Sequence, residues 1–272
     1  MNQLFTHYLI TRYNVPLEGW EVDKEGISTR DGAWLSHRLS LFTKYCIPTV
    51  VAQTEKNFTW LIYCDKNTPE DALKEIYNSL HVIPHSEIRL VTGYHDCMAD
   101  IDQTLSKAAA PFVITSRLDN DDGIGKDYIK MVQKHFIPYD GTILNLLHGH
   151  GYHPLNKVST LLWNMQMNHF TSLIEKTKPG GGHMSIRGFQ HHSPPSHFQM
   201  IDLPVKNAWL KIFHERNLKS SIFGYPNFMI SLKKLYGIEK NDSEININHT
   251  IRYLIWWLRD GYKRKIKRST SK

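Results

Sequence analysis

The stretch PFVITSRLDNDDG, residues 111–123, decides the fold prediction, because in it an apolar run passes directly into an acidic cluster. The apolar run is typical of a strand buried on both faces, as the strands of parallel sheets are. The cluster that follows is Asp119, Asn120, Asp121 and Asp122. Ligands of open α/β sheets bind at the carboxyl ends of the strands, so the sequence places this cluster at a candidate binding site.

Strands and helices are expected to alternate on both sides of this stretch. The expected strands are 8–13, 58–64, 88–92, 111–115 and 142–147, and the expected helices are 34–51, 100–110, 126–136 and one that begins after Thr68. Thr68 is expected to cap its helix, with Pro69 at the first position, and Pro48 is expected to interrupt or end the first helix. This alternation predicts an α/β fold with a mainly parallel sheet flanked by helices.

The pattern loosens beyond residue 150. Residues 177–200 are rich in Gly, Pro, Ser and His and are expected to form a long loop that covers the site. Helices are expected at about 205–216 and 246–267. Most of the 16 histidines, including those in these loops, are expected to face water.

Charge is distributed unevenly along the 272 residues. The net charge is +7, but residues 259–272 hold seven cations and one anion, so the remainder is almost neutral. A broad nucleic-acid-binding face is therefore not expected. Three cysteines without a CxxC spacing favour a reducing compartment. No segment has the pattern of a signal peptide or a spanning helix, and the cytoplasm is the expected location.

The acidic cluster suits a hard divalent cation, which takes carboxylate ligands together with water and substrate phosphates. The alternative is a turn that caps a helix, where Asp and Asn are common and Gly123 would assist. The buried strand before the cluster and the α/β context favour the metal, which we expect to be Mn²⁺ or Mg²⁺.

Five segments resemble a known family. HYLITRYNV (7–15), WLSHR (34–38), FTWLI (58–62), TSRLDNDD (115–122) and WLK (209–211) are similar to the bacterial family described as "putative rhamnosyltransferase", over roughly residues 7–220. The resemblance implies a GT-A glycosyltransferase domain, residues 1–240, whose DxD motif binds a divalent metal and a nucleotide-sugar diphosphate. It also implies transfer of a sugar such as rhamnose to a glycan or lipid-linked acceptor in cell-surface polysaccharide synthesis.

The resemblance assigns roles to individual residues. Asp119 and Asp121 match the DxD motif, Asp122 is adjacent to it, and His214 matches a late histidine that completes the metal sphere. The residues implied at the nucleotide sugar are Arg12, Asn14, Asp65, Arg117 and Asp119. Two simpler interpretations stay open, namely a structural ion pair for Arg117 and a helix-end position for His214.

The catalytic base is left among three residues. An inverting transfer needs a carboxylate that takes the proton of the acceptor hydroxyl, and Glu175, Asp202 and Glu215 follow the acidic cluster in the sequence. Two other functions also stay open. A metal-dependent phosphohydrolase would need an aspartate in the first strand, and residues 8–15 contain none. A non-catalytic, membrane-peripheral protein would bind nucleotide or lipid only.

Residues 241–272 are expected to form a separate amphipathic helix with a basic tail. Ile251, Leu254, Ile255 and Leu258 have helical spacing, Trp256 and Trp257 lie beside them, and a basic cluster follows at 263–268. Such a helix either lies on an anionic membrane surface or packs on the body of the protein. A lipid-linked acceptor favours the membrane.

Overall fold

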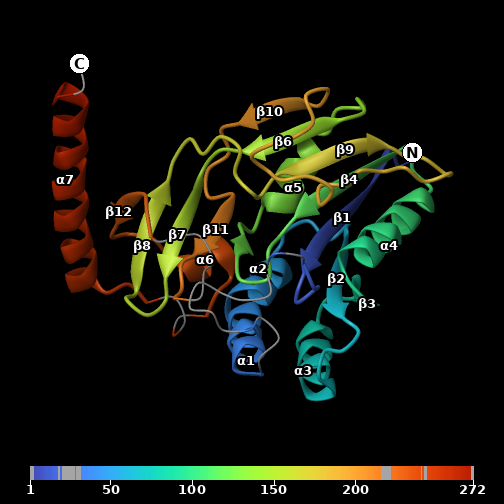
Figure 1. Cartoon of the computed structure of the whole chain (residues 1–272), viewed down its shortest axis with the longest axis horizontal. Helices are drawn as coiled ribbons and strands as arrows, with labels where there is room; N and C mark the ends of the chain where they lie inside the picture. Colours follow the sequence, from blue (N-terminus) through green and yellow to red (C-terminus); the bar gives the residue numbers. More distant parts are fainter. Residues whose placement is uncertain are drawn as a thin grey trace.

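The structure is a computed structural model that describes residues 3–17, 19, 28, 32–215, 222–239, 241 and 244–270, with side chains described as far as residue 260. Two sheets lie side by side (Figure 1). The N-terminus lies near one end of the molecule, and the C-terminal helix α7, Ile247–Thr270, stands at the other end.

The larger sheet has seven strands in the order β10-β6-β9-β4-β1-β2-β3. Their bounds are β1 Phe5–Arg12, β2 Thr59–Asp65, β3 Ser86–Val91, β4 Phe112–Arg117, β6 Thr142–Leu146, β9 Ser172–Lys176 and β10 Gln199–Leu203. Neighbouring strands are parallel except at β9, which is antiparallel to β4 and β6. The order β3-β2-β1-β4 is that of a doubly wound α/β sheet. The predicted α/β fold, with a mainly parallel sheet flanked by helices, is confirmed.

Helices cover both faces of the larger sheet. Their bounds are α1 Gly32–Leu41, the π-helical turn η1 Phe42–Cys46, α2 Ile47–Val51, α3 Glu70–Leu80, α4 Tyr94–Ser106 and α5 Tyr128–Lys134. Successive side chains of a strand point to opposite faces, and β1 shows the result. Leu9 belongs to the core that includes Ile76 of α3 and Ile129 of α5, whereas Ile10 belongs to the core that includes Ile101 of α4.

The smaller sheet has five strands in the order β12-β8-β7-β11-β5. Their bounds are β5 Gly123–Ile124, β7 Gly149–His153, β8 Val158–Leu162, β11 Trp209–Ile212 and β12 Tyr225–Asn227, and the short helix α6 is Leu232–Tyr236. Beside β5 the backbones approach so closely that a Cβ on Gly125 would lie 2.0 Å from the carbonyl oxygen of Asn207. Since β4 ends at Arg117 and β5 begins at Gly123, residues 118–122 connect the larger sheet to the smaller one.

The predicted helix at 205–216 is wrong. Residues 209–212 form β11, which pairs in parallel with β7 and antiparallel with β5. A short apolar run does not distinguish a buried strand from a buried helix. Pairing with two neighbouring strands, both distant in sequence, decides the conformation here. The loop predicted for 177–200 is found, with no helix or strand between residues 177 and 198.

Two details of the helix ends also differ from expectation. Pro69, not Thr68, is the N-cap of α3, because the Thr68 hydroxyl donates to the Asp65 carbonyl oxygen (2.6 Å). Pro48 does not end the helical segment, although the π-helical turn η1 interrupts the α-helix directly before α2. Pro48 lies in the first turn of α2, where the missing N–H of a proline is tolerated.

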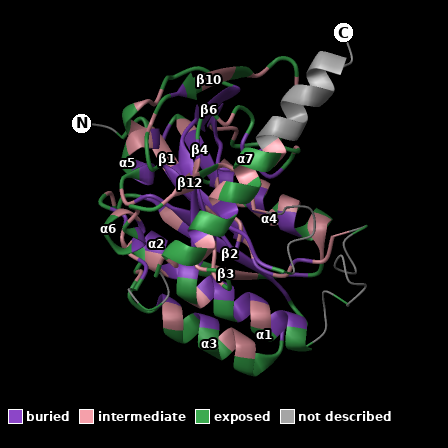
Figure 2. Ribbon diagram, turned by 90° about the vertical axis from the view of Figure 1, so that its left-hand side faces the viewer, coloured by how far each residue is buried: buried purple, intermediate pink, exposed green. Residues whose placement is uncertain are grey.

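Helix α7 packs on the smaller sheet by one side only. Thr250 and Tyr253 are buried, the Tyr253 hydroxyl donates to the Gly224 carbonyl oxygen (3.1 Å), and the Trp257 ring lies 5.4 Å from that of Tyr225. Exposed residues predominate on its outer side (Figure 2). In the described part of the chain, no helix combines the length and the apolar character needed to cross a membrane.

Candidate functional site

The acidic cluster lies at the junction of the two sheets, where β1 and β4 end. Leu118 N–H donates to the Ile10 carbonyl oxygen (3.2 Å), which extends the β1–β4 pairing to the edge of the cluster. Asn120 donates to the Tyr13 carbonyl oxygen and accepts from Arg38 Nη1 (3.2 Å). The cluster is therefore fixed to the end of β1 and to α1, at the carboxyl edge predicted from the sequence.

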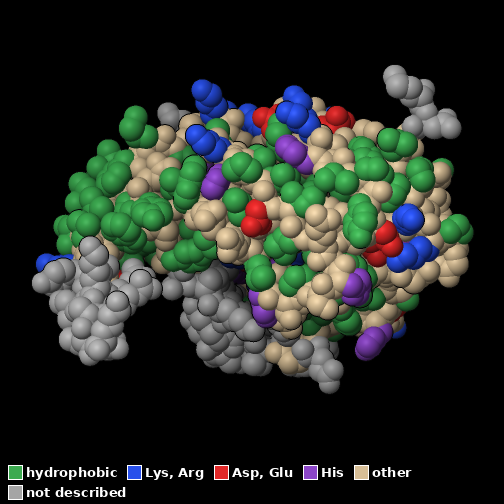
Figure 3. Space-filling model, turned by 90° about the horizontal axis from the view of Figure 1, so that it is seen from above, with side chains coloured by type: hydrophobic (Ala, Val, Ile, Leu, Met, Phe, Trp, Pro, Cys, Tyr) green, Lys and Arg blue, Asp and Glu red, His purple; other side chains and the backbone are tan. Residues whose placement is uncertain are grey.

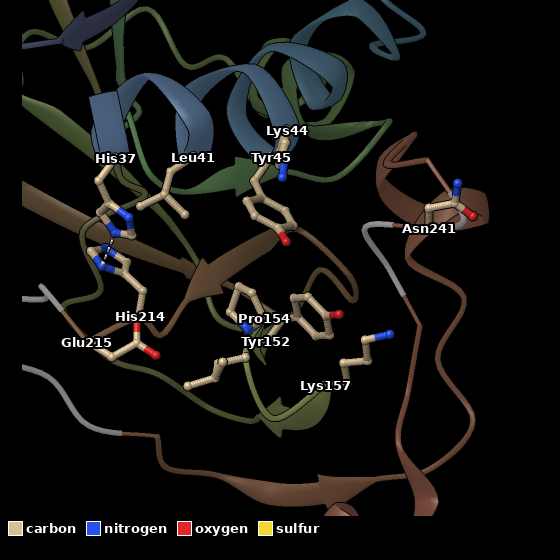
Figure 4. A pocket seen from close by; sticks show the side chains of 11 residues that line it. His37, Leu41, Lys44, Tyr45, Tyr152, Pro154, Lys157, His214, Glu215 and Asn241 are labelled. Atoms are coloured by element: carbon tan, nitrogen blue, oxygen red, sulfur yellow. Dashed lines mark hydrogen bonds between the residues drawn. The ribbon is translucent and has the colours of Figure 1, made fainter. Parts of the chain in front are cut away.

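Asp121 is buried and paired with a cation. Its Oδ2 lies 2.6 Å from Arg38 Nη1 and 3.0 Å from His214 Nε2, and only 6% of the residue is exposed. Burial opposes ionisation of Asp121, but the Arg38 charge and the His214 hydrogen bond outweigh it and lower its pKa. His214 Nδ1 in turn lies 3.4 Å from His37 Nε2 (Figure 4).

Asp122 is fully buried, and its two carboxylate oxygens have three partners from two segments. Oδ2 lies 2.9 Å from both His169 Nε2 and Lys211 Nζ, and Oδ1 accepts from Ile212 N–H (2.9 Å). Burial lowers the pKa of Lys211, but the attraction of Asp122 outweighs it and the net shift is upward. Asp122 thus connects β11 and the β8–β9 segment to the end of β4.

Asp119 is the most exposed carboxylate of the cluster, with 32% of its side chain accessible. Its Oδ1 lies 2.7 Å from Arg187 Nη1 and 3.6 Å from Arg117 Nε. Burial opposes ionisation here too, but the charges of Arg117 and Arg187 hold the pKa of Asp119 well below its usual range. Arg187 Nη2 also donates to the carbonyl oxygens of Ile10 and Leu118 (2.6 Å each).

Ligand atoms of Asp119, Asp122 and His169 all lie within 4.8 Å of one another. Carboxylates suit hard cations such as Mg²⁺ and Mn²⁺, and an added imidazole is a ligand of transition metals, so these donors fit the metal that the sequence predicts. His169 was not a sequence-based candidate, since it stands alone in an irregular segment. His214, the predicted ligand, contacts Asp121 instead of this group.

Arg12 and Arg117, both predicted at the nucleotide sugar, are the last residues of the neighbouring strands β1 and β4. The Arg12 guanidinium carbon lies 6.0 Å from the centre of the Tyr94 ring. Burial and then the charge of Arg117 lower the pKa of Arg12, although Asp119 opposes this. Positive charge is thus concentrated beside the exposed face of Asp119.

Asn14 and Asp65, also predicted at the nucleotide, lie together between β1 and β2. Asn14 Oδ1 accepts from Asp65 N–H (3.0 Å), and Asn14 Nδ2 donates to Thr68 Oγ1 (2.9 Å). The Asp65 carboxylate accepts from Asn67 N–H (2.9 Å). These contacts form the turn that leads from β2 to α3, at the same edge of the sheet as the acidic cluster.

Two of the three candidate bases have structural partners. Glu175 is 2% exposed and accepts from the N–H groups of Met184 and Ser185 (2.9 Å each), so it fixes the loop that carries Arg187. Asp202 lies on the edge strand β10 and accepts from Asn145 Nδ2 (2.7 Å).

Glu215, the third candidate, is exposed and follows His214 directly. It borders a cavity of about 330 Å³ that His37, Tyr45, Tyr152 and His214 also line. Figure 4 shows this cavity between α1 with η1 on one side and the β7–β8 turn on the other. His214 lines this cavity and contacts Asp121, so the cavity lies next to the acidic cluster. Of the three candidate bases, Glu215 is the one that borders it.

Comparison with curated protein sequences gives no match. Among solved structures, the chain is similar to S. aureus TarS 1–349 in complex with UDP-GlcNAc, with 12% identity, a TM-score of 0.47, and coverage of 80% of this chain and 61% of that one. Another structure of TarS 1–349 has 11% identity and a TM-score of 0.43, with coverage of 76% of this chain and 60% of that one. HddC from Yersinia pseudotuberculosis has 10% identity and a TM-score of 0.34, with coverage of 74% of this chain and 91% of that one. The chain thus spans about 60% of the length of these TarS structures.

The chain is assigned to a family by a family model of the sequence, and not by these structural similarities at 10–12% identity. This family model covers most of the chain, from the middle of β1 to the start of β12. Its range includes the acidic cluster and the residues found around it, among them Arg38, His169, Arg187, Lys211 and His214. With a match over residues 7–225, the chain belongs to the family described as "Putative rhamnosyl transferase".

Proposed function

We propose that the protein is a glycosyltransferase that uses a nucleotide-sugar donor. The observation that carries the proposal is the charge at the carboxyl ends of β1 and β4, in a chain of this family. Around three carboxylates, the described residues place five cations: Arg12, Arg38, Arg117, Arg187 and Lys211. An excess of positive charge that includes arginines suits the diphosphate of a donor and the charge that develops on it as it leaves.

In this proposal, the donor lies across the exposed face of Asp119. Arg12 and Arg117 bind the diphosphate, and the nucleoside extends towards Asn14 and Asp65. Asp119, Asp122 and His169 would hold Mn²⁺ or Mg²⁺, which would stabilise negative charge on the diphosphate. Asp121 and His214, expected at the metal, are assigned instead to fixing α1 and the end of β11 around it. Arg187 holds Asp119 in place.

Glu215 is the proposed base. We place the acceptor in the cavity beside it, because the cavity adjoins the cluster through His214 and Glu215 is accessible there. A base must come within hydrogen-bond reach of the proton that it removes, and the buried Glu175 is committed to two backbone N–H groups. The description of the family supports rhamnose as the sugar. The proposed acceptor is a glycan or a lipid-linked glycan of cell-surface polysaccharide synthesis, on the cytoplasmic side.

The donor is tested with the purified full chain and a panel of dTDP-, UDP- and GDP-sugars. We expect slow release of nucleoside diphosphate from one donor class, stimulation by Mn²⁺ or Mg²⁺, and inhibition by EDTA. Arg12→Gln should weaken binding of the same nucleoside diphosphate about tenfold, since hydrogen bonds to charged groups are among the stronger ones. Absence of both binding and release with every donor would contradict the proposal.

The base is tested by comparing two carboxylates. Glu215→Gln should lower the rate of transfer about 100-fold or more, with donor binding unchanged because Glu215 lies on the acceptor side. Asp202→Asn, on the distant edge strand, is the matched control and should transfer normally. Normal transfer by Glu215→Gln would remove Glu215 from the mechanism.

We further propose that α7 holds the enzyme against an anionic membrane surface. Ile247, Ile251, Ile255 and Leu258 fall on one side of the helix and are 61%, 43%, 45% and 55% exposed. Figure 3 shows hydrophobic side chains gathered at the end of the molecule that carries α7. The sequence that continues the helix contributes most of the net positive charge, and an apolar stripe with basic residues suits an anionic surface. The division into a domain 1–240 and a C-terminal unit 241–272 remains part of this proposal.

A further inference from the structure

We propose that Lys211 blocks the metal site until a diphosphate arrives, so that metal and nucleotide bind cooperatively. The inference rests on the proposed donor site, but it concerns a residue to which the resemblance assigns no role. Lys211 lies on β11, and its ammonium group is among the acidic residues of the cluster.

The position of the Lys211 ammonium carries the inference. Nζ lies 2.9 Å from Asp122 Oδ2, the oxygen that His169 also contacts. The other oxygen, Oδ1, accepts from Ile212 N–H. Both oxygens of Asp122 are therefore engaged, and the residue is fully buried. Oδ2 already has two partners and Oδ1 has one, so a cation that binds Oδ2 together with Asp119 and His169 must displace an existing partner. Lys211 is the partner with a long flexible stem, whereas the Ile212 N–H is fixed by the strand.

Displacing Lys211 without a new partner is unfavourable. Its side chain is 15% exposed, and a largely buried charge that loses its counter-ion is costly. A bound diphosphate changes this balance, because Arg12 and Arg117 would hold it beside Asp119 and its oxygens would offer the ammonium a second anionic partner. Lys211 then exchanges a carboxylate for a phosphate oxygen, and Asp122 becomes available to the metal.

Cooperativity follows from this exchange. If nucleotide raises the affinity for metal by a given factor, metal raises the affinity for nucleotide by the same factor. In the absence of nucleotide, Lys211 should therefore act as a competitor of the metal. Removing its charge should tighten metal binding even when no nucleotide is present, which is a property of this chain that can be measured without turnover.

The experiment measures Mn²⁺ binding to the full chain without nucleotide, from the EPR signal of free Mn²⁺. Lys211→Met and Lys211→Gln should each bind Mn²⁺ about tenfold or more tightly than the wild type, since a hydrogen bond between charged groups no longer competes. Gln can still donate to Asp122, so it covers the case in which the Met variant fails to fold. Adding Asp119→Asn to the Lys211→Gln variant should remove the gain, which locates it at this site.

Arg12→Met is the matched control. It removes a positive charge close to Asp119 but no described partner of Asp122, so the nucleotide-free Mn²⁺ affinity should change little. An equal gain in Arg12→Met would overturn the inference in favour of a general field effect. Wild-type affinity as tight as that of the Lys211 variants, or no Mn²⁺ binding in any variant, would overturn it too. None of these outcomes decides whether the protein transfers sugar, which donor turnover tests separately.

Discussion

Asp121 and Arg38 form a buried ion pair between the acidic cluster and α1. Both residues are less than 10% exposed and their charged atoms lie 2.6 Å apart. From the sequence, Asp121→Ala is expected to leave the fold intact, as for a carboxylate on a surface loop. The structure predicts otherwise, because Arg38 would keep a buried charge without its partner. Breaking such a pair costs about 3–5 kcal/mol, and urea denaturation should show a loss of this size in the free energy of unfolding.

The double variant Arg38→Met/Asp121→Ala provides the control for Asp121. It removes both charges and should recover much of the lost stability, because replacing a buried pair by apolar groups is often neutral. If the loss in the free energy of unfolding of the double variant equals the sum of the losses in the Arg38→Met and Asp121→Ala single variants, the two side chains do not stabilise each other.

The sequence leaves open whether α7 binds a membrane or packs on the body of the protein. In the structure α7 packs on the smaller sheet by one side and exposes an apolar stripe on the other. Deleting it would expose the β8–β12 surface that it covers, so point variants test the membrane proposal better. Ile251→Ser/Ile255→Ser should weaken co-sedimentation with vesicles rich in phosphatidylglycerol by about tenfold or more. Thermal stability should be unchanged, since both side chains are already exposed.

Tyr77→Ser/Val82→Ser is the control for α7, because these apolar residues are equally exposed elsewhere. It should bind vesicles like the wild type, and binding of both should weaken with salt as exposed charges are screened. Failure of the full chain to bind at low salt would contradict the membrane proposal. A concentration-dependent dimer lost in Ile251→Ser/Ile255→Ser would identify a second copy as the partner.

Two buried neutral histidines should set the response of the whole molecule to mild acid. His7 and His150 are 1% and 4% exposed, although most histidines are expected from the sequence to face water. Burial lowers the pKa of His7 to about 3 and that of His150 to about 4. In the unfolded chain both take up protons below about pH 6.5, so the unfolded state binds more protons and stability falls as pH drops.

At pH 5 each buried histidine should cost about 2 kcal/mol of stability relative to pH 7. Urea denaturation at several pH values measures this slope. His7→Gln and His150→Gln should each flatten it between pH 6.5 and 5, whereas His192→Gln, an exposed residue, should leave it unchanged. An unaltered slope in both buried variants would mean that other groups dominate the acid response.

Five of the seven strands of the larger sheet, β1, β2, β3, β4 and β6, could be predicted together with the helices that cover it, because their signals are local, whereas β9 and β10 were not predicted. The strand Phe112–Arg117 begins with three apolar residues, and the acidic residues follow it after Leu118 alone, so sequence order places the cluster at the carboxyl edge. The resemblance to the family adds the expectation that the cluster binds a metal and a diphosphate. Arg12 and Arg117 follow in the same way, since each is the last residue of its strand.

Only the tertiary structure decided what surrounds these residues. His169, Arg187 and Lys211 reach the cluster from 47 to 89 positions away, and no local pattern distinguishes them from other histidines or cations in loops and strands. The same holds for β11, whose short apolar run fits a helix until β5 and β7 pair with it. The amino-acid sequence by itself determined most strands of the larger sheet, the edge that carries the site and the carboxylates there. The counter-ions of those carboxylates were decided by folding, because the energy of a buried charge depends on neighbours in space rather than in sequence.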